Sequence, residues 1–214
     1  MNAKFDAHTG HDDPVRLKPG QLNETVGILT RAFYDDPLLK YVCQGENRRL
    51  PKTTHIIRSV VRYGSLYGEV WVTPGEISGA MVWMPPRTDN MTLIRQIRTG
   101  MIFDRLKLGK ADSDRYNLFN ATVNDLHHTV MNQDHWYLFV LGVDPDQHGQ
   151  GTGTKLMNYM LKRIDQDGSP VYLTTTHDGV IPFYKRLGFN VEGTAIVPES
   201  DLHLSGLIRP ARVK

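Results

Sequence analysis

The most constraining feature of the chain is the order of segments between residues 136 and 189. An apolar run, WYLFVLGV, covers residues 136–143 and stops at Asp144-Pro145. The glycine-rich stretch His148-Gly149-Gln150-Gly151-Thr152-Gly153 follows at once. Apolar residues then recur at the spacing of an amphipathic helix, and a second apolar strand is predicted over residues 171–174. Strand, glycine turn, helix and strand in this order are typical of a phosphate-binding device.

A glycine-rich turn at the start of a helix suits a diphosphate for a physical reason. The first backbone N–H groups of a helix have no partner inside it, and the helix dipole adds about half a positive charge there. Gly149, Gly151 and Gly153 leave this end open, because glycine has no Cβ and tolerates unusual dihedral angles. An ordinary tight turn is the alternative interpretation of these glycines taken alone.

Two common phosphate-binding loops do not fit these residues. A P-loop requires glycine, lysine and then serine or threonine where this chain has Thr154-Lys155-Leu156. A dinucleotide fingerprint that starts at Gly149 requires glycine or alanine at position 154, and Thr154 does not meet that requirement either. Both loops are therefore excluded.

A second motif lies downstream of the glycine turn, where residues 181–189 read IPFYKRLGF. This segment is similar to the P-F-Y-x-x-L-G-F motif of the GNAT superfamily of N-acetyltransferases. The glycine turn resembles that family's pyrophosphate loop, Arg/Gln-x-x-Gly-x-Gly/Ala. Weaker similarity extends over residues 15–210, and the nearest likeness is to the puromycin N-acetyltransferase type.

The chain departs from the family pattern at two places. His148 stands where arginine or glutamine is usual; its backbone can still serve, and an imidazolium can assist a diphosphate below a pKa of about 6.5. Many members also carry an asparagine shortly before the motif tyrosine, and residues 177–180 read HDGV. The second departure puts one cofactor contact in question and leaves the fold unaffected.

The resemblance and the hydrophobic pattern together predict an α+β, three-layer fold. A mixed central sheet of about six or seven strands carries helices on both faces. We expect a mobile tail over residues 1–13 and one domain over residues 14–214, with a helical insertion at about 88–131. Helices are predicted over residues 22–34, 37–41, 53–67, 92–108, 112–131 and 181–187. Strands are predicted over residues 15–17, 69–73, 77–84, 137–143, 171–174, 190–197 and 201–208.

Composition narrows the classes of partner and location. The formal net charge of the 214 residues is +2, which is too small to indicate a nucleic-acid partner. No apolar run approaches the roughly 20 residues of a membrane span, so no membrane partner is expected. Cys43 is the only cysteine, which rules out an intramolecular disulfide and favours a reducing, cytoplasmic setting.

The family resemblance implies roles for particular residues, with acetyl-CoA as the co-substrate. Leu141, Gly142 and Val143 would hold the acetyl and pantetheine arm, and the N–H near Val143 would polarise the thioester carbonyl. Gly142, inside an apolar strand, indicates a β-bulge or a close backbone approach. The alternative is a glycine that is simply buried in the strand and has neither role. The diphosphate would lie on the loop residues His148, Gly149, Gln150, Gly151, Thr152, Gly153 and Thr154. Tyr184 would be the general acid; the alternative is a tyrosine packed on Phe183 with its hydroxyl as a buried anchor.

The general base is less clearly marked in the sequence. Many members place a glutamate on the fourth strand, and residues 136–141 contain no carboxylate. The candidates to replace it are Asp35, Asp36, Glu69, His135 and His203. Each has a structural alternative, such as capping of the next helix by Asp35 or Asp36, and a water chain is a further option. No metal site is expected, because the adjacent His127 and His128 point in different directions along a helix.

These observations predict an acetyl-CoA-dependent N-acetyltransferase that acts on a small-molecule amine, such as an antibiotic or toxin. The alternatives are a protein or peptide N-acetyltransferase and a non-catalytic acyl-CoA sensor. The insertion between the third and fourth strands would form part of the acceptor pocket or a homodimer contact.

Overall fold

A computed structural model describes residues 12–88, 92–99 and 104–212. Its centre is a seven-stranded mixed sheet in the order β1-β2-β3-β4-β5-β7-β6, in which only β4 and β5 are parallel neighbours. The strands are β1 (Val15–Arg16), β2 (Glu69–Val72), β3 (Gly79–Met84), β4 (Trp136–Val143), β5 (Val171–Thr175), β6 (Asn190–Ile196) and β7 (His203–Arg209). The predicted α+β class with a mixed sheet of six or seven strands is confirmed.

One face of the sheet is covered by two helices, α7 (Thr152–Asp167) and α8 (Ile181–Arg186). The apolar side of α7 presents Leu156, Met157, Met160 and Ile164, none of which is exposed, to β3, β4 and β5. These residues have the spacing of one helical face, so the periodicity in the sequence correctly predicts which side of α7 packs against the sheet.

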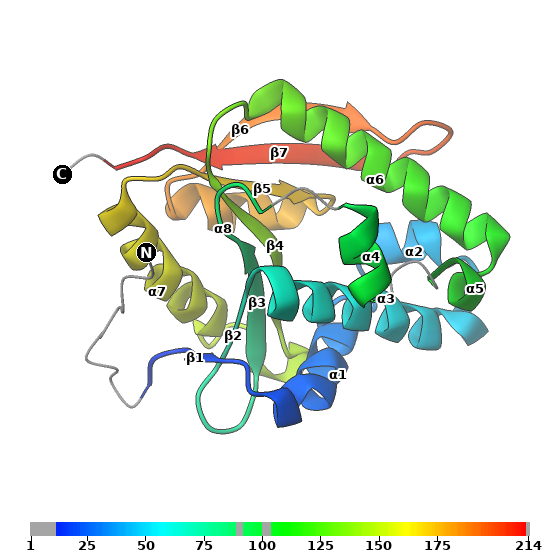
Figure 1. The fold of residues 1–214 in the computed structure, drawn as a ribbon, viewed down its shortest axis with the longest axis horizontal. Coiled ribbons are helices and arrows are strands. Elements are labelled where there is room, and N and C mark those ends of the chain that lie inside the picture. Colours follow the sequence, from blue (N-terminus) through cyan, green and yellow to red (C-terminus); the bar gives the residue numbers. More distant parts are fainter. Residues whose placement is uncertain (1–11, 89–91, 100–103, 213–214) are drawn as a thin grey trace.

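The other face carries helices from the rest of the chain. These are α1 (Leu22–Ala32), α2 (Pro37–Val42), α3 (Glu46–Tyr67), α4 (Leu93–Thr99), α5 (Asp104–Leu108) and α6 (Lys110–Val130). Figure 1 shows α6 running along β6 and β7, with α2, α3 and α5 gathered at one end of the molecule and α7 at the other. Short 3-10 turns, η1 (Pro19–Gln21), η3 (Pro145–Gln147) and η4 (Asp178–Val180), connect the larger elements.

Two predicted helices differ from the observed ones. The helix expected from residue 53 begins seven residues earlier, because Gly45 starts it and Pro51 is accommodated within its second turn. In the range predicted as one helix, residues 92–108, the structure gives α4 and α5, and residues 100–103 lie outside the described residues. The expected tail lies almost wholly outside them too.

No helix in the described ranges combines the length and the apolar character that a membrane span requires.

Candidate active site

Two neighbouring parallel strands separate part-way along their length. β4 pairs with β5 only through Trp136, Tyr137 and Leu138, and then continues to Val143 alongside β3 alone. The end of β4 that borders the glycine loop therefore leaves an open seam beside β5, which we call the β4–β5 split. An edge that is not hydrogen-bonded to a neighbouring strand can receive a ligand.

A β-bulge in β4 sets which side chains face which layer. The register with β3 shifts so that Val82 opposes Val140 and Trp83 opposes Leu138, which leaves Phe139 as the extra residue. Phe139 and Val140 consequently both pack on the side of α1 and α3. After the bulge the alternation resumes, and Leu141 contacts the α7 side.

The bulge does not lie at Gly142, the strand glycine that the sequence offered for it. A Cβ at Gly142 would come within 2.6 Å of Leu29 Cδ2 and 2.9 Å of Phe33 Cε2. Glycine is required there because side chains at the end of α1 pack directly against the strand backbone. This is the close backbone approach that the sequence offered as the alternative to a bulge. The bulge lies three residues earlier, at Phe139.

The backbone of Val143 faces the split. Asp144 donates its N–H to Ser78 O at 2.8 Å. Along a strand of an antiparallel pair, the backbone N–H and C=O groups of successive residues point alternately toward the partner strand and away from it. Gly142 and Asp144 therefore face β3, and Leu141 and Val143 face the other way. The side chain of His148 folds back so that its Nε2 lies 3.1 Å from Val143 O, which leaves the Val143 N–H at the split.

The glycine loop leads from this strand end into α7. Gly149 and Gly151 have φ angles of 79° and 80°, a left-handed conformation that strongly favours glycine. Gly151 is the N-cap of α7, no side chain caps the helix, and its first turn contains no acidic residue. The open N–H groups and the helix dipole are the features that bind a diphosphate.

Gly153 differs from the other two loop glycines. Its φ is not positive, and a Cβ there would make only ordinary contacts, 3.6 Å from Val143 Cγ2 and 3.8 Å from Phe183 Cζ. Neither backbone conformation nor packing requires glycine at this position. Of the other predicted loop residues, Thr152 is half-buried, and His148, Gln150 and Thr154 are exposed.

Tyr184 lies on α8, on the same face as α7. Its ring contacts Phe183 and Phe189, with centroids 5.1 and 5.7 Å apart, and is 8% exposed. Its hydroxyl forms no hydrogen bond with a residue in the described ranges. Burial raises its pKa well above the usual value, and the group stays protonated at neutral pH.

The turn between α1 and α2 crosses the split on the opposite face. Phe33, at the end of α1, lies against Gly142 of β4. Three residues later, Asp36 Oδ1 accepts a 3.4 Å hydrogen bond from the hydroxyl of Thr176, which directly follows β5. Asp36, at the split, and Tyr184 therefore lie on opposite sides of the sheet.

Comparisons with known proteins fit this geometry. Residues 120–189 match the model of the Acetyltransferase (GNAT) family. Over these residues the chain carries a GNAT acetyltransferase domain. An uncharacterised N-acetyltransferase of Schizosaccharomyces pombe is 28% identical over 180 residues, covering 81% of this chain and 72% of that protein.

Solved structures support the GNAT fold along most of the chain. A Corynebacterium glutamicum protein described as a histone acetyltransferase and related acetyltransferase superposes with a TM-score of 0.70 and 19% identity, over 95% of this chain and 98% of that one. A Drosophila melanogaster polyamine N-acetyltransferase that forms N-acetylagmatine gives 0.61 and 18%, over 92% and 98%. The family match and the Schizosaccharomyces pombe relative indicate an acyltransferase of class 2.3.1. The likeness to the puromycin type stays a prediction.

Asp36 is both a helix cap and a perturbed carboxyl in this GNAT domain. Its Oδ1 accepts the N–H of Leu38 at 2.9 Å, as expected for a residue that precedes a proline-started helix. Burial raises its pKa, and the hydrogen bonds from Leu38 and Thr176 oppose that rise. A raised pKa makes a carboxylate a stronger base than an exposed aspartate.

Two other base candidates are held in structural networks away from the split. Glu69 receives two hydrogen bonds from Arg163, at 2.6 and 3.0 Å, and pairs with Arg16 at 2.9 Å. Although burial alone would raise its pKa, these cations bring it below the usual range. His135 is buried, with its Nε2 2.8 Å from His127 Nε2 and its Nδ1 2.7 Å from Gln133 O.

The remaining two candidates lie nearer the split and are exposed. Asp35 pairs with Lys40 at 2.8 Å. His203 begins β7 two residues before Ser205, the partner of Thr175, at the same sheet edge as Thr176. Across the described ranges, no group of three or more histidine, cysteine or acidic side chains is arranged to hold a metal ion.

Thr176 was not singled out from the sequence. The sequence does contain a signal for it, because three threonines, residues 174–176, follow the apolar part of a predicted strand. Ligands commonly bind at the carboxyl ends of parallel strands. What the run could not reveal is its partner, Asp36, which lies 140 residues away in the chain.

Proposed function

We propose that this GNAT domain transfers the acetyl group of acetyl-CoA to the amine of a small molecule, by direct attack in a ternary complex. The observation that carries the proposal is the placement of two titratable side chains on opposite faces of the sheet, Asp36 beside the β4–β5 split and Tyr184 on the α7 side. Direct transfer needs a base on the acceptor side and a proton donor on the thioester side.

The residues on the α7 face fit the co-substrate. The N–H groups at the start of α7 would hold the diphosphate. Leu141 and Val143, whose backbones face the unpaired side of β4, would line the pantetheine arm, with Gly142 between them. Acetyl-CoA, once bound, supplies an activated thioester. The Val143 N–H would polarise its carbonyl, an oxyanion-hole role.

The residues on the other face fit the acceptor. Most amines are protonated at neutral pH, and only the neutral form attacks a carbonyl. Asp36 would attract the ammonium group and then take its proton, directly or through water. Tyr184, which stays protonated, would donate to the departing thiolate.

No covalent enzyme intermediate is required. Cys43 is fully buried in the cluster of Leu39, Val42 and Ile56, and burial raises its pKa to about 11. A thiol in that state is not a nucleophile at neutral pH.

The function is tested first by thermal unfolding with and without acetyl-CoA, with ATP and NAD as controls. At about 100 times the dissociation constant, a bound ligand adds about 2.7 kcal/mol to the free energy of unfolding. For a chain of this size that is roughly a 5–11 °C rise in Tm. The rise should be specific to acetyl-CoA, and no rise at millimolar acetyl-CoA would remove the enzyme interpretation.

A panel of amines then tests the acceptor by the appearance of free CoA thiol. We expect turnover with small primary amines. Turnover only with peptides would favour a protein acetyltransferase, and a Tm rise without turnover across the panel would favour an acyl-CoA sensor.

A further inference from the structure

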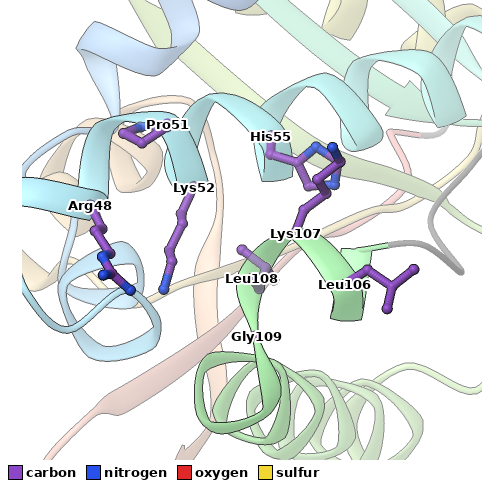
Figure 2. Close-up of a pocket in the computed structure, with 8 residues that line it drawn as sticks. All are labelled: Arg48, Pro51, Lys52, His55, Leu106, Lys107, Leu108 and Gly109. Carbon is purple, nitrogen blue, oxygen red and sulfur yellow. The ribbon is translucent and has the colours of Figure 1, made fainter.

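A cavity separate from the split lies between α3 and the short helix α5. Its volume is about 550 Å³. Figure 2 shows Arg48 and Lys52 leaving α3 on the side that faces Leu108 and Gly109, and Lys107 rising from the other wall toward His55. We call it the α3–α5 cavity.

The described residues that line this cavity carry an excess of positive charge. None of them is acidic, while three of them, Arg48, Lys52 and Lys107, are permanent cations. Arg48 and Lys107 are exposed, and neither forms an ion pair with a residue in the described ranges. Like charges around one hollow repel each other and attract an anion.

The third cation belongs to a buried triad that leaves an excess positive charge. Asp112 is 8% exposed and is paired with both Lys52 and Arg115. Arg115 also donates to Val42 O at 3.0 and 3.1 Å, so that the guanidinium is fixed against the end of α2. One carboxylate between two cations leaves a net charge of about +1 at the cavity wall.

The wall is also preorganised and partly apolar. Leu108 is buried against Val42, Cys43 and Ile56, and Pro51 adds an apolar surface beside Arg48. A packed wall of this kind loses little entropy when a ligand binds. These features suit an organic anion better than a bare inorganic ion.

We propose that the α3–α5 cavity binds a small organic molecule through an oxyanion group, a phosphate or a carboxylate, at a site distinct from the acetyl-CoA site. The glycine loop lies at the start of α7, on the other face of the sheet, so both sites can be occupied together. Arg48 and Lys107 clamp the oxyanion from the two walls, and Lys52 completes the set of donors.

Isothermal titration with inorganic phosphate and with citrate tests this site, using the full chain with and without saturating CoA. The comparison of the two anions distinguishes a phosphate ligand from a carboxylate one. Binding of at least one of them should be unchanged by CoA, and it should weaken as salt rises because the contacts are ionic. Arg48→Gln and Lys107→Gln should each weaken it about tenfold or more.

Arg62→Gln is the matched control, because it removes the same charge from an exposed position on the same helix, outside the cavity lining. Its affinity should stay within about twofold of the original protein. Lys52 is not substituted, because removal of its charge would take away one of the two cations that pair with the buried carboxylate of Asp112. The proposal would be overturned if neither anion bound, if CoA displaced the bound anion, or if all three variants lost affinity equally.

Discussion

The two sides of the β4–β5 split are built from different kinds of sequence. On the α7 face, the strand end, the glycine loop and Tyr184 all come from one continuous stretch, residues 136–189. On the opposite face, Asp36 meets Thr176 across 140 residues of chain. In the proposed reaction, local backbone geometry would bind the diphosphate and the thioester, whereas the acceptor would contact a surface assembled by tertiary packing. The predictions below test whether the two sides divide the chemistry in this way.

The largest effect is expected from Asp36→Asn. Asparagine caps a helix as well as aspartate does, so α2 should persist while the basic charge is lost. We expect kcat/KM to fall by about 10²- to 10⁴-fold with the affinity for acetyl-CoA unchanged. Asp35→Asn, at the exposed neighbouring carboxylate, is the control and should retain activity. A normal rate in Asp36→Asn would move the base elsewhere, with His203 as the next candidate.

The same carboxylate should appear in the pH profile. Asp36 accepts a proton only when ionised, and burial raises its pKa above the ordinary 3.8. The acidic limb of kcat/KM should therefore lie at a higher pH than an exposed aspartate would give, and activity should fall as the pH drops through it. The limb should disappear from the residual activity of Asp36→Asn. An unchanged limb in that variant would assign it to another group.

Tyr184→Phe should lower kcat by about 10²-fold and spare acetyl-CoA affinity, because only the proton donor is removed. The ring contacts with Phe183 and Phe189 stay, and the hydroxyl bonds to no described residue, so unfolding by urea should be almost unchanged. A large loss of stability with normal turnover would instead support the packed-anchor interpretation.

Glu69→Gln should separate stability from chemistry. The substitution leaves Arg163 and Arg16 without their shared carboxylate, and we expect the free energy of unfolding to fall by about 2–3 kcal/mol. The folded pKa of Glu69 is lowered, so its stabilisation is complete at neutral pH and is lost as pH falls from the unfolded value, about 4.3, through the folded one. Urea unfolding at pH 7 and at acid pH should show the gap to the original protein narrowing. A fall in kcat at saturating substrates would contradict the structural role.

Paired alanine substitutions in the loop should give the smallest effects. Gly151→Ala forces a Cβ into a φ of 80° and should cost about 1–2 kcal/mol of stability. Gly153→Ala meets only ordinary contacts and should leave stability unchanged or raise it by up to about 1 kcal/mol. Thermal unfolding of the two variants checks the order. An equal loss in both would mean that Gly153, too, is required by the fold.

Much of the α7 face could be predicted because its signals are local. Alternation and helical spacing marked β4, α7 and β5, and the φ angles of Gly149 and Gly151 match the turn that the glycines predicted. Where the bulge lies could not be predicted, because the register of β4 is fixed by β3, which lies far away in the chain. The same limit applied to α3: whether a helix continues through Pro51 depends on what its first turns pack against.

By itself, the sequence determined the GNAT fold and the position of the loop at the start of α7, since strand, turn and helix signals are written in consecutive residues. Only the tertiary structure decided which polar side chains meet. It joined Asp36 to Thr176, tied Glu69 to Arg163 and paired His135 with His127, and so separated one base candidate from two structural ones. The physical reason is that ionisation and reach depend on burial and on neighbours in space, and a residue's neighbours along the chain do not specify either.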